Sequence, residues 1–371
     1  MDINLDVKAG NRIRSFYLFF IIISAQISVG ITGIPKFILK ETQQDAWISI
    51  LIAFVYMLIV VTAMFFMLTQ YQNTDIFGIQ VDIFGKWIGK LLGTIYIMYF
   101  TLSILAIMLT YIQIIQIFIY PTMSSFVMAF LLLTLVVYSV LGGLRVIVGV
   151  IFIFTLLSSW ILFLLYDPIS RMEMTHLLPI FQSSIPELLK GARASIFTFL
   201  GIEAIFVIFP FIENRQDAKR STILGICAST LIVLLMTMIS IGYYSSEDFE
   251  EINWSVLRLF KGISLPMIER LDYVVVVEWM MVTLPTIIFI MWMITHGMKR
   301  MYKIKQKTTL YIVAIIVLII CSFIEDEHTV EIITEISSVV GFWIVFVYPL
   351  ILLPFVIVKM KWRKHKGSAK E

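Results

Sequence analysis

Long apolar blocks separated by short polar connections make up most of the chain. A helix needs about 20 apolar residues to cross the roughly 30 Å hydrocarbon core of a bilayer. Outer-membrane barrels would instead show period-2 segments of about ten residues, and the chain has none of these. The pattern therefore predicts an all-α integral membrane protein with ten transmembrane helices. The ten blocks are 16–35, 47–69, 91–120, 124–141, 146–166, 193–212, 221–244, 271–296, 308–324 and 337–358.

Turn-forming residues mark the ends of several blocks. Pro121 ends the third block, Gly142 and Gly143 separate the fourth from the fifth, and Asp167-Pro168 closes the fifth. The third block is longest, so we expect a tilted or projecting helix. The prediction is a single polytopic membrane domain over 1–371, with a first half at 16–166, a second half at 193–358 and a basic tail at 359–371.

Composition agrees with this class of protein. Hydrophobic residues make up 60% of the chain and charged residues 14%, against about 25% charged residues in soluble domains, and the mean hydropathy is +0.96. So few charges cannot cover the surface of a soluble protein of this length. We expect no cleaved signal peptide, because residues 1–15 are polar and run into the first block.

The distribution of Lys and Arg predicts the orientation. If the N-terminus is cytoplasmic, 20 of the 28 Lys and Arg residues fall on the cytoplasmic side. Loop 325–336, which is then outside, has five acids and no Lys or Arg. The positive-inside rule therefore places both termini in the cytoplasm. The basic tail serves either as a topology anchor or as a contact to anionic lipid head groups of the bilayer.

Two blocks in matching positions carry helix-breaking patterns. Five helices per half put the halves in opposite orientations, which is the arrangement of an inverted repeat in many secondary transporters. The first helix of each half contains an interruption, with Gly30 and Gly33 in span 1 and Gly201 and Glu203 in span 6. Interrupted helices offer N–H groups to a carboxylate and C=O groups to a cation. An alternative is that these glycines only allow close helix packing.

The candidate ligand-binding residues follow from these interruptions and from polar positions on spans 3 and 8. We expect the first break to hold a ligand carboxylate and the second an ammonium group, as in a zwitterion such as an amino acid. A helical stripe on span 3 and a threonine on span 8 are expected to line the pocket. Each candidate also has a structural interpretation: Glu203 could bond to a neighbouring span, and the stripe could provide polar contacts between helices. Glu278, a second acid within a span, is either a buried functional group or a water-exposed acid of the vestibule. The candidates are Gly30, Ile31, Thr32, Gly33, Tyr99, Ser103, Gly201, Glu203 and Thr283.

Signatures of other functions are missing from the sequence. It has no GxxxxGK[ST] phosphate loop and no HExxH or GxSxG motif. We therefore expect no enzyme, no catalytic residue, no metal and no cofactor. Nucleic-acid binding has no support, because the basic residues are divided among short loops.

Two segments resemble a known family, the spore germination permeases, which are the B subunits of GerA-type germinant receptors. The first includes Gln26-Ile27-Ser28-Val29-Gly30, Gly33-Ile34-Pro35-Lys36 and Gln44-Asp45-Ala46-Trp47-Ile48-Ser49. The second is Phe199-Leu200-Gly201-Ile202-Glu203 with Phe209-Pro210-Phe211-Ile212. The family typically has the glycine and glutamate adjacent, whereas Ile202 intervenes here. The resemblance covers nearly the whole chain.

The resemblance implies a fold and a function. The family belongs to the amino acid–polyamine–organocation superfamily, so a LeuT-like 5+5 inverted repeat with interrupted helices 1 and 6 is expected. It implies a receptor subunit in the spore inner membrane that binds a small germinant, often an amino acid, together with A and C subunits. Two rivals remain open: a secondary amino acid transporter, and a scaffold or conduit without a ligand of its own.

Overall fold

The computed structural model describes residues 1–371 except 1–2, 72, 246–248, 250–251, 264–269 and 369–371. The part described is helical, and its backbone pairing outside helices includes one isolated bridge between Ile13 and Ile212. The end of the predicted basic tail, 369–371, lies outside the described residues.

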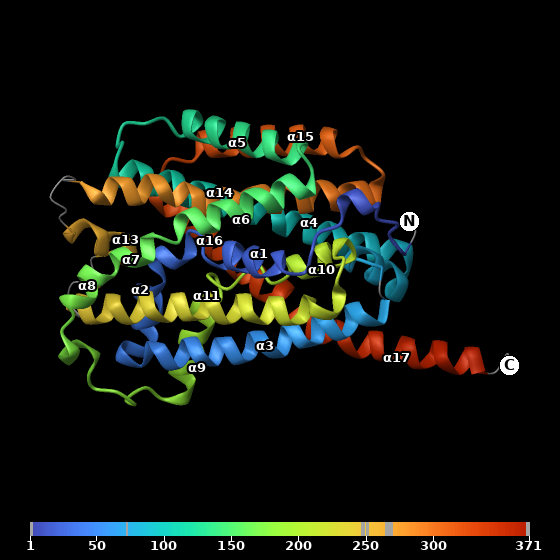
Figure 1. The fold of residues 1–371 in the computed structure, drawn as a ribbon, viewed down its shortest axis with the longest axis horizontal. Coiled ribbons are helices and arrows are strands. Elements are labelled where there is room, and N and C mark those ends of the chain that lie inside the picture. Colours follow the sequence, from blue (N-terminus) through green and yellow to red (C-terminus); the bar gives the residue numbers. More distant parts are fainter. Residues whose placement is uncertain (1–2, 72, 246–248, 250–251, 264–269, 369–371) are drawn as a thin grey trace.

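The helices form one elongated bundle, which Figure 1 shows with its long axis horizontal. The first-half helices are α1 (Tyr17–Gln26), α2 (Gly30–Thr42), α3 (Ala46–Tyr71), α4 (Ile76–Phe118), α5 (Ser125–Leu141), α6 (Leu144–Ser158), α7 (Ile161–Leu164) and α8 (Tyr166–Ser170). The second-half helices are α9 (Ile185–Ser195), α10 (Ala204–Ile208), α11 (Arg215–Tyr243), α13 (Ser255–Leu259), α14 (Leu271–Tyr302), α15 (Gln306–Phe323), α16 (Glu327–Gly341) and α17 (Tyr348–Ser368).

Shorter helical turns connect these elements. A π-helical turn, Phe342–Val347, joins α16 to α17. The 3-10 turns are Ala9–Asn11, Gln43–Asp45, Met174–Leu177, Phe209–Phe211 and Phe260–Gly262.

Among the described residues, seven helical segments are long and apolar enough to cross a membrane. They are Gly30–Tyr71, Ile76–Phe118, Leu144–Ser170, Arg215–Tyr243, Leu271–Tyr302, Gln306–Phe323 and Glu327–Arg363. The first of these combines α2 and α3, which are separated by the turn at Gln43–Asp45. Two shorter apolar helices, α1 and α5, lie within the predicted blocks 16–35 and 124–141. The prediction of an all-helical, multi-span architecture is confirmed.

Three predicted boundaries were wrong. The block expected at 91–120 belongs to α4, which already starts at Ile76 and changes direction at Gly85. Gly85 has φ 82° and ψ 173°, a conformation that glycine adopts without steric cost. The sixth and tenth blocks also start early, with α9 at Ile185 and α16 at Glu327. In each case the first turns of the helix are amphipathic or polar, so a search for apolar runs does not detect them.

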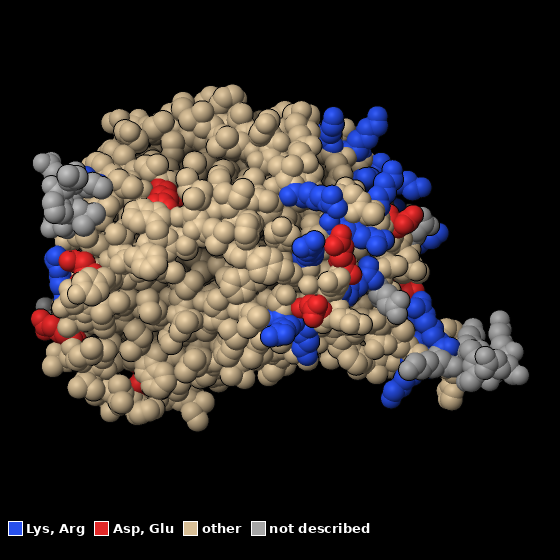
Figure 2. Space-filling view, in the orientation of Figure 1, with Lys and Arg blue, Asp and Glu red and all other residues tan. Residues whose placement is uncertain are grey.

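Lys and Arg side chains gather at one end of the bundle. Both termini lie at this end in Figure 1, and Lys and Arg dominate it in Figure 2, whereas the flank seen in this view is mostly uncharged. This distribution matches a bundle that exposes its flanks to lipid.

Candidate ligand-binding site

Both predicted helix interruptions are present. The first lies at 27–29, between the end of α1 at Gln26 and the start of α2 at Gly30. The second lies at 196–203, between α9 and α10. Gly201 has φ 116°, a backbone conformation that side chains disfavour. The first break is earlier than expected, so Gly30 and Gly33 belong to α2 and not to the break.

The two interruptions contact each other. Gln26 donates a hydrogen bond from Nε2 to the carbonyl oxygen of Phe199 at 3.2 Å. A Cβ placed on Gly30 would lie 3.1 Å from Oγ1 of Thr198, and a Cβ on Gly201 would lie 2.5 Å from Cβ of Ala25. Glycine is therefore needed at Gly201 for both its dihedral angle and this close approach.

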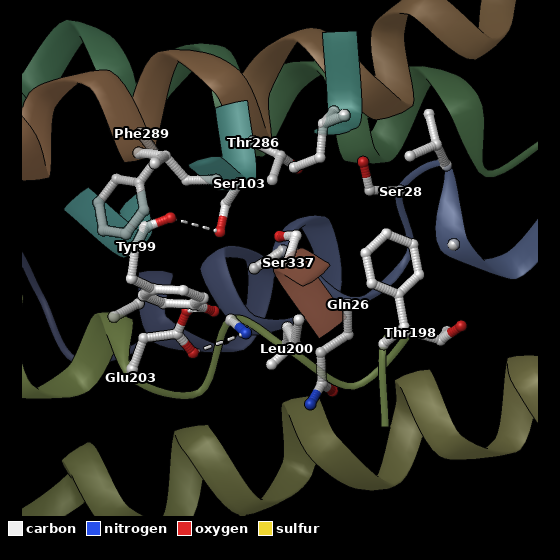
Figure 3. Close-up of a pocket in the computed structure, with 18 of the residues that line it drawn as sticks. Gln26, Ser28, Tyr99, Ser103, Thr198, Leu200, Glu203, Thr286, Phe289 and Ser337 are labelled. Carbon is white, nitrogen blue, oxygen red and sulfur yellow. Dashed lines mark hydrogen bonds between the residues drawn. The ribbon is translucent and has the colours of Figure 1, made fainter. Parts of the chain in front are cut away.

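A cavity of about 50 Å³ lies between the interruptions (Figure 3). Because one water needs about 10–15 Å³ on this scale, the cavity has room for about three to five waters. It is lined by Ala25, Gln26, Ser28, Val29, Gly30, Tyr99, Ser103, Ile107, Phe197, Thr198, Leu200, Gly201, Glu203, Ala204, Thr286, Phe289, Ile290, Met293 and Ser337. These residues come from both interruptions, from the adjoining ends of α1, α2 and α10, and from α4, α14 and α16, so the site is built from both halves of the chain.

Glu203 joins the second interruption to α4. Its Oε1 accepts a hydrogen bond from the Tyr99 hydroxyl at 2.9 Å, and its Oε2 accepts one from the Gly201 N–H at 2.7 Å. The side chain is buried, and Tyr99 is only 2% exposed. A carboxylate has about four lone-pair positions, so each oxygen can accept a further bond from a ligand.

Two hydroxyl groups at the cavity have no hydrogen-bond partner among the described residues. These are Oγ of Ser28, in the first interruption, and Oγ of Ser337, in α16. Both serines are buried. Buried polar atoms are usually satisfied by protein or by ordered water, so these two hydroxyls are open to water or to a polar ligand.

The cavity contains five of the nine predicted site residues: Gly30, Tyr99, Ser103, Gly201 and Glu203. The other four do not line it. Ile31 lines a separate apolar cavity, and Oγ1 of Thr32 donates to the carbonyl of Val29. Gly33 packs against Asn253, and Thr283 is buried one turn before Thr286, which lines the cavity instead.

Several lining residues were not predicted. Gln26 and Ser28 lie in the segment that the sequence singled out, so proximity to the glycines could have indicated them. Thr286 follows Pro285, a proline inside α14 that cannot donate a backbone hydrogen bond. Ser337 carried no signal, because a lone serine in an apolar helix has many structural roles.

The Gln44-Asp45-Ala46-Trp47-Ile48-Ser49 segment lies outside this cavity and fastens a connection that precedes α9. Asp45 is 1% exposed, and its carboxylate accepts hydrogen bonds from the N–H groups of Phe181, Gln182 and Ser183 at 2.6, 2.7 and 2.8 Å. Ser49 donates from Oγ to the carbonyl of Leu188 in α9 at 2.9 Å. The segment thus fixes the position of α9, the helix that leads into the second interruption.

Glu278 also lies outside the cavity. It accepts a hydrogen bond from Nε1 of Trp160 and is not among the lining residues. Among the described residues, no group of three or more His, Cys, Asp or Glu side chains is placed to hold a metal ion.

Solved structures share this fold. A Na⁺-coupled sialic acid symporter in a substrate-bound outward-open state superposes with a TM-score of 0.63 at 12% identity, over 91% of this chain and 80% of the symporter chain. MHP1, a nucleobase-cation-symport-1 family transporter in a closed conformation, gives a TM-score of 0.56 at 13% identity, over 91% and 78% of the two chains. At these identities the likeness establishes a LeuT-type transporter fold.

Curated relatives are similar over almost the full length. GerQB of Bacillus cereus, a spore germination protein, is 29% identical over 353 residues, which are 95% of this chain and 98% of GerQB. The spore germination protein YndE of Bacillus subtilis (strain 168) is 23% identical over 358 residues, again 95% and 98% of the two chains. A family model described as "Spore germination protein" matches residues 12–330. The chain therefore belongs to the spore germination permease family.

Proposed function

We propose that this chain is the permease-like subunit of a nutrient germinant receptor and that it binds a small zwitterion, such as an amino acid, in the cavity between the two interruptions. The observation that carries the proposal is this cavity, where Glu203 and two unpaired hydroxyls face the junction of two broken helices. Membership of the spore germination family supplies the cellular context. Ten spans in a 5+5 inverted repeat, cytoplasmic termini and a place in the spore inner membrane are part of the proposal.

The chemistry of the cavity suits opposite charges at its two sides. Glu203 supplies a carboxylate for a ligand ammonium group. Gly30 starts α2, and no side chain among the described residues caps this helix N-terminus, whose partial positive charge favours a ligand carboxylate. The small volume favours the smallest amino acids, and larger ones would require the bundle to open.

Signalling requires partners and two arrangements of the bundle. A ligand shifts an equilibrium only by its difference in affinity for the two states. We propose that the A and C subunits of the receptor respond to this shift.

The test is Glu203→Gln in spores of a deletion strain complemented with this chain and its partner subunits. A glutamine retains the local bonds, because its oxygen can accept from the Gly201 N–H while its amide donates to the Tyr99 hydroxyl oxygen. Losing a buried charge partner of a ligand costs about 2–5 kcal/mol, so the half-maximal concentration of the effective germinant should rise at least about 30-fold. The probes are glycine and L-alanine first, then other amino acids, sugars and nucleosides.

The matched control is Glu278→Gln, which removes a carboxylate from the same helical bundle but outside the cavity. Receptor levels are compared by immunoblotting, and the control should respond at the wild-type concentration. An unchanged response of Glu203→Gln at equal receptor level removes Glu203 from the ligand site.

The fold also supports a second candidate, a secondary amino acid transporter, since the two solved structures compared above are transporters. Proteoliposomes containing this chain alone separate the two functions. Saturable binding of labelled L-alanine without flux supports the sensor, and saturable flux supports the transporter.

A further inference from the structure

A second, larger cavity lies at the basic end of the bundle. Its volume is about 600 Å³, and it is bounded by the N-terminal segment 5–11, the α5–α6 turn, the end of α14 and the start of α15. It shares no lining residue with the first cavity. The two are separated along α14, where Phe289 lines the first cavity and stacks at 5.7 Å on Trp292, which lines the second.

Positive charge dominates this cavity. Lys8, Lys299, Lys303 and Lys307 line it, and none of these four lysines forms an ion pair within the described part of the chain. Asp6 is the one carboxylate among the described lining residues. Four ammonium groups around one concavity repel each other and attract an anion.

The other two basic groups of the cavity are already engaged. Arg300 donates from Nε to Oδ2 of Asp75 at 3.0 Å and from Nη2 to the carbonyl of Ile3 at 2.9 Å. His296 lies 3.1 Å from the same carboxylate oxygen. This buried cluster forms part of the cavity wall. Because Asp75 is paired with Arg300 and His296, its negative charge does not neutralise the four lysines.

The backbone of Lys303 supports a role for its side chain. Lys303 ends α14 with φ 58° and ψ 20°, the left-handed conformation. Glycine is the usual residue at such a helix end, because a side chain is disfavoured there. A backbone outlier of this kind is a basis for a hypothesis of function, and Lys303 lines the cavity.

Part of the remaining wall is apolar, whereas Asn11, Thr295 and Gln306 are polar. Val140, Leu144 and Leu310 line the apolar part from α5, α6 and α15. Helices α5 and α15 pack side by side at one edge of the bundle (Figure 1). Their outer faces carry exposed apolar side chains, among them Phe130, Leu131, Ile312 and Ile315. An anion bound by the lysines therefore lies next to a surface suited to acyl chains.

We propose that this basic cavity binds a phosphate group, carried by an anionic phospholipid or by a free phosphate. Basic cavities between helices at the cytoplasmic side of membrane proteins suit such head groups. The site is independent of the germinant cavity and of the proposed receptor function.

The experiment uses the purified full chain in detergent. The affinity for phosphatidylglycerol is compared with that for phosphatidylcholine by native mass spectrometry, and inorganic phosphate is added as a competitor in a second arm. The test variant is Lys299→Gln/Lys303→Gly/Lys307→Gln. The matched control is Lys86→Gln/Lys219→Gln/Lys361→Gln, which removes the same charge at lysines that do not line the cavity.

Wild type should prefer phosphatidylglycerol, and the test variant should lose about fivefold in affinity per lysine, or about 100-fold in total. The control should retain the wild-type preference. Competition by millimolar phosphate supports a free phosphate as the ligand, and its failure supports the lipid. Equal losses in both triple variants, or no loss in the test variant, overturn the proposal.

Lys303→Gly alone separates binding from folding. Glycine adopts the left-handed conformation without steric cost, so the thermal stability of this variant should equal or exceed that of wild type. The variant also lacks one lysine charge, so its affinity for the phosphate ligand should fall about fivefold. Unchanged affinity would contradict the role assigned to this lysine.

Discussion

The carboxylate of Asp45 offers a sharp test of how the chain positions its second interruption. It accepts three backbone N–H groups from residues 181–183 and is 1% exposed. In Asp45→Asn, only one oxygen remains. If this oxygen faces Gln182 and Ser183, the amide group faces the N–H of Phe181, and two donors oppose each other.

The magnitude follows from these contacts. Hydrogen bonds to a charged group contribute about 1.5–3 kcal/mol each, and a buried N–H left without an acceptor costs about 1–3 kcal/mol. Weakening two bonds and losing the third should therefore destabilise the chain by about 3–5 kcal/mol. An unfolding entropy of about 2.1 cal/mol/K per residue converts this into a fall in Tm of about 4–6 °C.

The assay is thermal unfolding in detergent, together with chymotrypsin cleavage after Phe181. Asp326→Asn is the matched control. Asp326 is an exposed N-cap that accepts one bond, from the N–H of Thr329, and asparagine caps helices about as well as aspartate, so its Tm should stay within about 1 °C of wild type. An Asp45→Asn chain that melts with wild type and resists cleavage would refute the anchoring role.

Two further predictions concern other buried contacts. Gly201→Ala places a Cβ 2.5 Å from Cβ of Ala25, at a residue with φ 116°. This change should lower stability by about 2–5 kcal/mol, so that both Tm and the germinant response fall. The control is Gly149→Ala, whose added Cβ meets nothing within 4 Å and which should retain or raise Tm. Burial raises the pKa of Asp75, but the His296 hydrogen bond and the Arg300 charge outweigh it and hold that pKa below its usual value. The resulting stabilisation is present above the unfolded pKa and is lost as pH falls through the folded one. Tm should therefore drop more steeply in wild type than in Asp75→Asn as the pH falls below about 5, and equal slopes would contradict this.

The sequence was informative where single residues constrain the backbone. Glycines followed by polar residues predicted both interruptions, because a break in a membrane helix needs conformational freedom and polar partners for the freed backbone groups. The same logic identified Gly201 and Glu203, which the structure brings to the cavity. It assigned the first break too far along the chain, since Gly30 and Gly33 are also compatible with the start of a helix.

Residues whose partners are distant in sequence were not predictable. Asp45 bonds to backbone groups 136 to 138 positions away, and backbone N–H groups leave no trace in the sequence. Ser337 reaches the cavity only because α16 packs against α4. The early part of α4 was not predicted, because its polar residues interrupt the apolar run. The N-terminus of this helix is capped by Asp75, whose side chain accepts a hydrogen bond from the N–H of Gly78 at 2.9 Å.

The proposed receptor function gives the contact between Tyr99 and Glu203 a particular importance. Under the proposed function, a ligand ammonium group shares the Glu203 carboxylate with the Tyr99 hydroxyl, so ligand binding alters the one direct side-chain bond described between the second interruption and α4. Helix α4 runs from this cavity to Gly85 and then to Asp75, which His296 and Arg300 fasten to α14. A change at Tyr99 can therefore reach the basic end of the bundle along α4, whose direction changes at Gly85. A sensor needs such a contact with two arrangements of different ligand affinity, whereas a purely structural glutamate would need only the bonds that it already makes.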